Sequence, residues 1–352
     1  MDQAASVISD PSSALYISFY PTLAAFPVPL PPKSVFVCAN SLVVSDKAVT
    51  AKHRYNLRVV ETLVGARILA KALGIPITNT ERITFREVVG RFAGEDETEL
   101  CIEELQEALQ VIIPKLDILK PKHGAGLTME EMIDMSGLTQ PEFDQVYLSW
   151  VDIEATHFQL YARAKHVLSE SLRVLQFRKI CLDACTSLAS GAGVLESLGN
   201  LMNESQKSCS SLFDCSCPEL DTLVSLSIQA GAFGSRLTGA GWGGCTVSLV
   251  AEDKVEEFIE KVSKTYEPYK GLEGEELNQV IFATKPSSGA CGTCRFRLSR
   301  VVTDLLCSVQ IYLIGYITLH SKVQQHFLLL LIVQENTKKF DQIQYIVVSI
   351  LA

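Results

Sequence analysis

Residues 234–244 read GSRLTGAGWGG, and four of the last six positions are glycine: Gly239, Gly241, Gly243 and Gly244. A loop without side chains exposes its backbone N–H groups and lets a ligand or another chain segment approach closely. The stretch lacks the lysine of a Walker motif and the spacing of a dinucleotide loop, and we expect it to link a helix to a strand, the reverse of both. Two interpretations stay open: a tight hairpin, or a loop that binds a phosphate or a substrate.

The segments on both sides of this stretch predict regular structure. Before it, Pro218 suits a helix start, and the apolar residues that follow have helical spacing. After it, residues 245–250 alternate as a strand, residues 255–266 have the spacing of a helix, and residues 280–283 form a closing strand. The glycine-rich stretch is therefore expected to lie inside a folded domain.

The upstream half predicts one strand followed by helices. Residues 34–39 form a short apolar run, which is typical of a buried strand. Four helical patterns follow: from Tyr55 to Gly74, from 97 to Pro114, from the capping box of Thr128 and Glu131 to Gly137, and from 156 to 177. Together these elements predict an α+β fold in which helices outnumber strands.

The two ends of the chain differ from this pattern. Prolines punctuate residues 21–32, which predicts an extended connector because each proline fixes φ and removes a donor. From residue 291 onward charged residues thin out, yet the uncharged run 305–319 is shorter than the roughly 20 residues that a spanning helix needs. Cys291 and Cys294 have no second cysteine pair and are weak evidence for zinc. We expect neither a membrane span nor a metal site here.

The composition excludes several classes of protein. With 352 residues, 47% hydrophobic and 20% charged, the chain can bury a large core. The net charge of −9 comes without the basic stripe that phosphate-backbone binding requires, so we expect no nucleic-acid partner. The eleven cysteines are spread along a chain that opens MDQAASVISD, which has neither a basic nor an apolar leader. We therefore expect reduced thiols and a cytoplasmic location.

Several motifs, in order along the chain, resemble those of one family. Residues 234–250, GSRLTGAGWGGCTVSLV, are similar to the C-terminal motif of the galactokinase branch of the GHMP small-molecule kinases. Residues 212–221 resemble the helix entry that precedes this motif. Other similar segments, the last two especially close to fungal members, are 163–167, 173–177, 55–61 and 282–286.

The resemblance implies a fold and a domain order. It extends from Met1 to about residue 290 and implies an α+β GHMP-kinase C-terminal domain over residues 33–290, preceded by a remnant of the N-terminal domain over residues 1–32. Residues 291–352 have no counterpart in the family and are expected to form an unrelated tail. The strands of the remnant would expose an edge and an apolar face that the missing half would cover.

The resemblance also implies roles for individual residues. Galactokinases transfer the γ-phosphoryl group of ATP to the anomeric hydroxyl of galactose and use Mg²⁺. Asp2 matches the aspartate that acts as general base. Tyr55 matches the tyrosine that contacts the sugar, and Asp46 and Lys47 fall where relatives place residues near the nucleotide. The loop glycines would shape the wall of the active-site cleft: Gly239, Gly241, Gly243 and Gly244.

Without the resemblance, the same residues have plainer interpretations. Asp2 would be a solvated terminal residue, and Tyr55 a half-buried tyrosine at a helix start. Asp46 and Lys47 would be an ordinary exposed pair. The family's N-terminal sugar-binding signature and its serine-rich phosphate loop also have no counterpart in this chain. Because each such element contributes a factor on the order of 10³ or more to the rate, we expect the polypeptide as printed to be inactive or nearly so.

The sequence leaves three alternatives to a galactokinase. The first is a catalytically silent galactokinase-like sensor, which binds sugar and ATP and docks a transcriptional repressor. The second is an N-acetylgalactosamine kinase. The third is a chain that forms no stable protein. Enzyme and sensor differ mainly in the phosphate loop, which has no counterpart here, so the sequence predicts galactose and ATP as ligands but neither a choice among these functions nor an oligomeric state.

Overall fold

The computed structural model describes residues 5, 7–44, 50–97, 100–186 and 192–289. The strands are β1 (Ser13–Ser18), β2 (Ala24–Pro29), β3 (Ser34–Asn40), β4 (Gly234–Leu237), β5 (Cys245–Ala251) and β6 (Ile281–Thr284). The α-helices are α3 (Tyr55–Ala72), α4 (Phe85–Ala93), α5 (Ile102–Ile112), α6 (Met129–Ser136), α7 (Gln140–Phe143), α8 (Leu160–Thr186), α9 (Ala192–Ser208), α10 (Pro218–Gln229), α11 (Val255–Thr265) and α12 (Gly274–Val280). Short 3₁₀ or π turns are η1 (Ile113–Leu119), η2 (Asp144–Leu148), η3 (Cys209–Phe213), η4 (Glu252–Lys254) and η5 (Glu267–Tyr269).

The larger sheet has the strand order β4-β5-β3-β6, and every neighbouring pair is antiparallel. Strand β3 lies inside it, with Val37 opposite Ser248 on one side and Ala283 on the other. This order is that of a split β-α-β-β-α-β arrangement. In it the first strand of the sheet, here β3, lies between the third and the fourth, here β5 and β6. One central strand, β3, therefore comes from the first part of the chain, and the other three strands come from residues 234–284.

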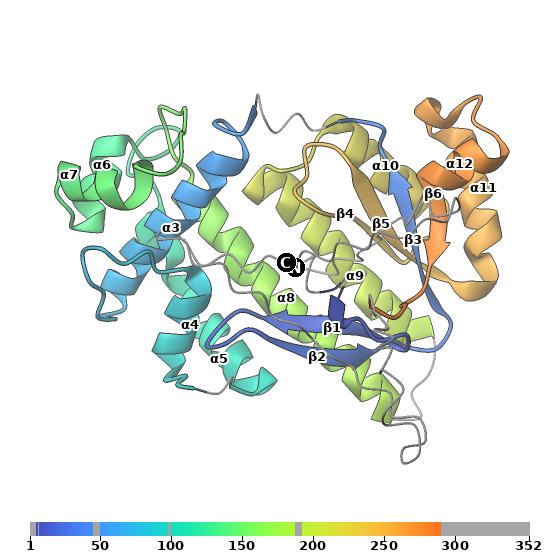
Figure 1. The fold of residues 1–352 in the computed structure, drawn as a ribbon, viewed down its shortest axis with the longest axis horizontal. Coiled ribbons are helices and arrows are strands. Elements are labelled where there is room, and N and C mark those ends of the chain that lie inside the picture. Colours follow the sequence, from blue (N-terminus) through green and yellow to red (C-terminus); the bar gives the residue numbers. More distant parts are fainter. Residues whose placement is uncertain (1–4, 6, 45–49, 98–99, 187–191, 290–352) are drawn as a thin grey trace, which may run out of the picture.

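Helices cover both faces of this sheet (Figure 1). Phe36, Val247 and Leu249 share one face and pack against α8 and α9. Val37 and Val250 point the other way, into a cluster with α10 and α11. Because side chains alternate along a strand, residues next to each other in sequence stabilise two different layers.

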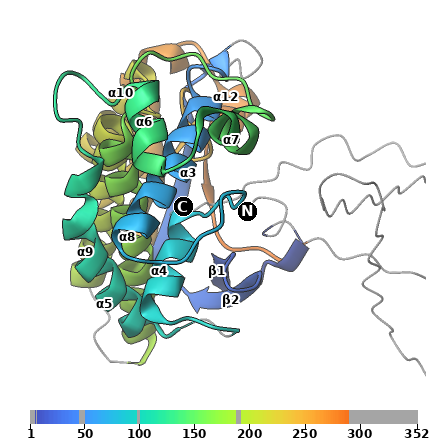
Figure 2. The same cartoon turned by 90° about the vertical axis from the view of Figure 1, so that its left-hand side faces the viewer.

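Helix α8 joins this layered part to a second, helical core. The helical core consists mainly of α3, α4, α5, α6 and the first half of α8. Along α8, Leu160 and Leu168 belong to the helical core, whereas Phe177 and Cys181 belong to the sheet side. At 27 residues, α8 is about 40 Å long and crosses both cores (Figures 1 and 2).

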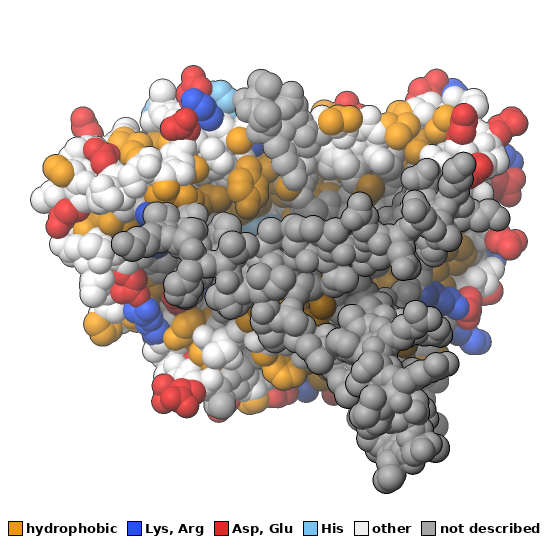
Figure 3. All heavy atoms as spheres, in the orientation of Figure 1, with side chains coloured by type: hydrophobic (Ala, Val, Ile, Leu, Met, Phe, Trp, Pro, Cys, Tyr) orange, Lys and Arg blue, Asp and Glu red, His pale blue; other side chains and the backbone are white. Residues whose placement is uncertain are grey.

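The hairpin of β1 and β2 forms a separate two-stranded sheet beside α8 (Figures 1 and 2). The guanidinium carbon of Arg178 lies 4.2 Å from the ring centroid of Tyr16 and 5.2 Å from that of Phe26. This cation–π contact attaches the hairpin to the helix. Phe19 and Leu23 are exposed, and among the described residues the two strands pair only with each other. The expected exposed edge and apolar side chains are therefore present, and other hydrophobic side chains also lie at the surface in Figure 3.

Several predicted elements are confirmed. Strand β3 and helix α3 occupy the predicted ranges. Thr128 and Glu131 form the predicted capping box of α6, and Gly137 ends that helix with a φ of 73°. Pro218 is the first residue of α10, and β5 begins at Cys245.

Other predictions were wrong or incomplete. Residues 24–29 are a strand and not a connector, and the prolines in it are tolerated because β2 is an edge strand. Residues 234–237 form β4, so the glycine-rich loop links two strands and not a helix to a strand. Helices α4 and α9 were not predicted from the sequence.

The whole apolar tail lies outside the part of the chain that the structure describes. Within the described parts of the chain, no helix combines the length and apolar character needed to cross a bilayer. Residues 291–352, with Cys291 and Cys294, lie outside the described residues, as do Asp2, Asp46 and Lys47. The predictions made for them stay predictions.

Helix α9 approaches β4 so closely that one glycine is required. A Cβ atom on Gly199 would lie 2.3 Å from the backbone carbon and oxygen of Phe233, whereas one on Gly193, in the same helix, would meet nothing within 4 Å. We expect Gly199→Ala to lower the free energy of unfolding by about 2 kcal/mol or more, because the helix must move off the sheet. Urea unfolding measures the change.

The matched control is Gly193→Ala. It adds a better helix former in open space and should raise the free energy of unfolding by up to about 1 kcal/mol. Equal effects of the two substitutions would contradict the close contact between α9 and β4.

Candidate active site

The glycine-rich loop spans Thr238–Gly244 and joins two antiparallel strands. Leu237 of β4 lies opposite Thr246 of β5. The N–H of Thr238 donates to the carbonyl oxygen of Cys245 at 2.9 Å and closes the base of the loop. The two strands thus form a hairpin, but the loop of seven residues between them is longer than a tight turn, and a binding role stays open.

Two glycines of this loop have open space beside them, and the other two, Gly241 and Gly243, are packed tightly. A Cβ on Gly239 or Gly244 would meet nothing within 4 Å, whereas one on Gly243 would lie 2.5 Å from the carbonyl oxygen of Val43. The backbone of Gly244 also donates to Val43 at 3.0 Å and accepts from Ser41 at 2.8 Å. The loop thus lies against the segment after β3 on one side and exposes bare backbone on the other.

Trp242 anchors the loop to the turn that follows α9. Its backbone N–H donates to the carbonyl oxygen of Cys215 at 2.7 Å, and its indole Nε1–H donates to that of Asp214 at 3.0 Å. Neighbouring Gly241, with a φ of 81°, allows this approach, since a Cβ there would lie 2.0 Å from the Cys215 oxygen. Glycine is required at this position by both conformation and space.

The turn itself is irregular and presents several carbonyl groups. Helix α9 continues into the π turn η3, and Asp214 then adopts a left-handed φ of 56°. Arg58 of α3 donates from Nε to the carbonyl oxygen of Phe213 at 2.6 Å and from Nη2 to the Asp214 carboxylate at 2.7 Å. Arg163 of α8 donates to the carbonyl oxygen of Leu212. Two arginines from different helices therefore hold one turn.

Glu61 lies between these two arginines and, with Asp214, supplies their counter-charge. Its carboxylate, 1% exposed, lies 3.2 Å from Nη1 of Arg58 and 2.9 Å from Nε of Arg163. Its other oxygen accepts from the backbone N–H of Gln159 at 2.7 Å. Burial lowers the pKa of Arg58, as does the charge of Arg163 beside it, while Glu61 opposes both effects. The network joins α3, α8 and the turn into one unit.

Tyr55 is the first residue of the helix that this network holds. Its side chain is 55% exposed, so the predicted half-buried environment is wrong and the phenol is accessible. The guanidinium carbons of the preceding Arg54 and of Arg58 lie 6.0 and 5.7 Å from the ring centroid of Trp242. The start of α3 is therefore placed next to the glycine-rich loop.

The structure brings together only part of the predicted set. Tyr55 and the four loop glycines belong to neighbouring elements, while Asp2, Asp46 and Lys47 lie outside the described residues. The sequence motifs gave no role to the residues that connect these parts. Their only local signal is a charge directly beside apolar positions of the helical pattern: Arg58 and Glu61 next to Leu57 and Val60, and Arg163 next to Ala164.

The described residues are better suited to bring backbone N–H groups close to a phosphate than to bind a metal ion. The bare backbone at Gly239 and Gly244 could approach a nucleotide closely. Within the described parts of the chain, no group of three His, Cys, Asp or Glu side chains is arranged to hold a metal ion. They therefore offer no ligand cluster of their own for Mg²⁺, which in kinases is usually held by one or two carboxylates together with phosphate oxygens.

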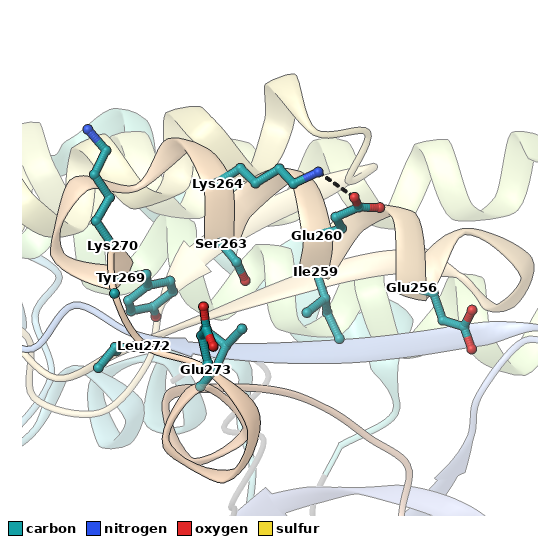
Figure 4. A pocket seen from close by; sticks show the side chains of 11 residues that line it. Glu256, Ile259, Glu260, Ser263, Lys264, Tyr269, Lys270, Leu272 and Glu273 are labelled. Atoms are coloured by element: carbon teal, nitrogen blue, oxygen red, sulfur yellow. Dashed lines mark hydrogen bonds and ion pairs between the residues drawn. The ribbon is translucent and has the colours of Figure 1, made fainter.

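A hollow of about 660 Å³ lies elsewhere, between α11 and the segment from η5 to α12 (Figure 4). Glu256, Glu260 and Glu273 line it together with Lys264 and Lys270. Glu260 forms an ion pair with Lys264, as Figure 4 shows. Because its charged side chains are exposed and partly paired, and none belongs to the loop or the turn, we do not place the active site there.

Comparisons with known proteins agree on one family. The model described as "GHMP kinases C terminal" matches residues 183–268. The chain is 36% identical to galactokinases of Dictyostelium discoideum, over 307 residues, and Saccharomyces cerevisiae, over 315 residues. Each match covers 83% of this chain and 58% of the relative, so the chain spans little more than half the length of these proteins.

A solved structure shows the same fold. The crystal structure of Lactococcus lactis galactokinase complexed with galactose matches with a TM-score of 0.51 at 21% sequence identity. The match covers 82% of this chain and 54% of that one. At this identity the likeness concerns the fold alone.

The buried carboxylate offers a test of the network. We expect Glu61→Gln to lower the free energy of unfolding by about 3–5 kcal/mol, because it removes the buried counter-charge that Arg58 and Arg163 share and leaves them only the exposed carboxylate of Asp214. Chemical unfolding monitored by circular dichroism measures this. The same substitution at Glu103, whose pair with Lys179 is exposed, should leave the free energy of unfolding nearly unchanged. Equally small losses would argue against the network.

The contact between loop and turn can be tested at Gly241. We expect Gly241→Ala to destabilise the protein by about 2–4 kcal/mol, since the new Cβ meets the Cys215 oxygen. Gly239→Ala, with a similar φ and open space, should cost only about 1 kcal/mol. In a Trp150→Phe background the emission of Trp242 reports the loop directly. An unchanged emission spectrum in Gly241→Ala would contradict the anchoring role of Trp242.

Proposed function

Because the chain belongs to the GHMP kinase family as a relative of its galactokinases, we propose that it is part of an ATP-dependent galactose kinase. The reaction is transfer of the γ-phosphoryl group of ATP to the anomeric hydroxyl of galactose. The observation that carries this proposal is the junction of the glycine-rich loop with the start of α3, where Tyr55 is accessible. This junction brings a bare backbone and a phenol hydroxyl to one part of the surface.

The described residues act in this proposal by binding and positioning. Tyr55 donates or accepts a hydrogen bond with a sugar hydroxyl and packs its ring against the apolar side of the sugar. Gly239 and Gly244 form the wall that the ligand approaches. Arg58 and Trp242 hold helix and loop in one arrangement, so neither has to be ordered when the ligands bind.

The remaining roles fall on residues outside the described part of the chain. We assign to Asp2 the acceptance of the proton from the anomeric hydroxyl, and to Asp46 and Lys47 positions near the nucleotide. ATP supplies the phosphoryl group. The described residues contribute no ligand cluster for Mg²⁺.

The proposal includes a domain order and a location. The boundary between residues 1–32 and residues 33–290 falls between β2 and β3. The hairpin then belongs to the N-terminal remnant and the layered sheet to the C-terminal domain. Residues 291–352 form the tail, and the protein acts in the cytoplasm.

The tyrosine is the sharpest test of the sugar site. We expect Tyr55→Phe to weaken galactose binding about 2- to 10-fold, because the hydroxyl loses one hydrogen bond with the sugar. Calorimetric titration of the chain with galactose measures this whether or not turnover occurs. ATP binding should not change. Tyr161→Phe, on α8, is the matched control, since its hydroxyl accepts only a 3.4 Å contact from Lys165.

A coupled assay for ADP release distinguishes the alternatives. Phosphorylation that depends on galactose supports the kinase. Binding of galactose and ATP without turnover supports the sensor, and a preference for N-acetylgalactosamine supports the third assignment. A cooperatively folded chain that binds none of these ligands would overturn the proposal, and a chain without a cooperative unfolding transition would indicate that no stable protein forms.

A further inference from the structure

Two cysteines lie together under the glycine-rich loop, at the turn that ends α9. Cys209 opens the π turn and Cys215 follows it, and the N–H of Cys215 donates to the carbonyl oxygen of Cys209 at 3.0 Å. Their side chains are 2% and 5% exposed and belong to one buried cluster with Trp242. The backbone thus brings together two thiols that are six residues apart.

A buried guanidinium faces the first of these thiols. Nη2 of Arg236, on β4, lies 3.7 Å from the sulfur of Cys209. Arg236 is 5% exposed, and its Nε and Nη1 atoms have no hydrogen-bond partner. Its ion pair with Glu170 of α8 is long, at 3.7 Å. The positive charge of Arg236 is therefore only partly neutralised and stabilises a thiolate at Cys209.

The surrounding charges favour an asymmetric pair. Contact with the thiol of Cys215 lowers the pKa of Cys209 against the effect of burial, and Arg236 lowers it further. Glu170 opposes this shift. The same thiol contact, together with burial, raises the pKa of Cys215. The charges of Arg236 and Arg58 offset part of this increase. One cysteine is thus suited to react as a thiolate and the other to follow as a thiol.

The remaining described cysteines lack this combination. Burial raises the pKa of Cys38 and of Cys181 to about 12. Cys101 and Cys185 are exposed, with no buried cation among their hydrogen-bond and ion-pair contacts. His166, close to the turn through its 2.9 Å contact with Ser208, is kept neutral because burial lowers its pKa to about 4. It does not add to the charge around Cys209 at neutral pH.

We propose that Cys209 and Cys215 are a dithiol site that a hydroperoxide converts into a disulfide. The thiolate of Cys209 attacks one peroxide oxygen, the O–O bond breaks, and with one proton an alcohol or water leaves and a sulfenic acid remains. The sulfur of Cys215 then attacks the sulfenic sulfur, and the hydroxyl leaves with the thiol proton as water. Two electrons pass from the two sulfurs to the peroxide, and a dithiol reductant reverses the change.

The disulfide would form where the glycine-rich loop is held. The carbonyl of Cys215 accepts from Trp242, and the new ring would enclose Asp214, which accepts from Arg58. Oxidation should therefore change the environment of Trp242 without needing any catalytic activity. In the Trp150→Phe background, we expect a reversible shift of Trp242 emission on oxidation.

Peptide mapping of the full chain is the direct test. Cleavage after Lys207 and Arg236 releases one peptide, residues 208–236, which holds Cys209, Cys215 and also Cys217. After treatment with hydrogen peroxide and alkylation, we expect this peptide to carry one alkyl group and to be lighter by two hydrogen atoms than the reduced peptide with a single alkyl group. Further cleavage before Asp214 should leave the two fragments joined.

Variants identify the pair and the role of the charge. Cys217→Ser should keep the bond, and Cys215→Ser should abolish it. Arg236→Met should slow oxidation at pH 7 on the order of tenfold, because the thiolate fraction falls, while Arg236→Lys should retain most of the rate. Urea-unfolded chain serves as a control and should lose the preference for this pair.

Three results would overturn the proposal. The first is a peptide 208–236 with three alkylated thiols under conditions that already oxidise Cys101 and Cys185. The second is a bond to Cys217. The third is the same rate in folded and unfolded chain. Because the first measurement uses the unsubstituted protein, the outcome does not depend on whether a variant folds.

Discussion

A single buried carboxylate, Glu61, holds together the parts of the chain that surround the candidate site. Arg58 and Arg163 come from different helices, and both bind carbonyl groups of the turn after α9. Two guanidiniums that are so deeply buried are tolerable only with a counter-charge between them. The positions of α3, α8 and the turn are thus mutually dependent, and the loop that Trp242 attaches to this turn depends on all three.

The site is shaped by backbone more than by side chains. Gly241 and Gly243 let the loop touch Cys215 and Val43, and Asp214 adopts a left-handed conformation. A loop held by main-chain hydrogen bonds has little freedom to collapse, so its open side stays accessible beside Tyr55. The same turn contains Cys209 and Cys215, so a change at either thiol would act on the segment that holds the loop.

Sequence patterns predicted the elements whose signals are local. The alternation in β5, the capping box at Thr128 and the proline at the start of α10 need no distant partner. The missed features depend on tertiary contact: β4 and α9 meet through glycine, and β2 pairs despite its prolines. For the same reason the motif match marked Tyr55 and the loop glycines but not Arg58, whose partners are carbonyl groups far along the chain.

The topology of the large sheet also has a consequence for protein synthesis. Strand β3 leaves the ribosome about 200 residues before its neighbour β5 and still longer before β6. At roughly 5–20 residues per second, this interval is on the order of ten seconds or more. During that time the apolar residues around Val37 have no sheet to join. Nascent chains of this protein should therefore depend on chaperones that shield one early strand, and slow translation should increase that dependence.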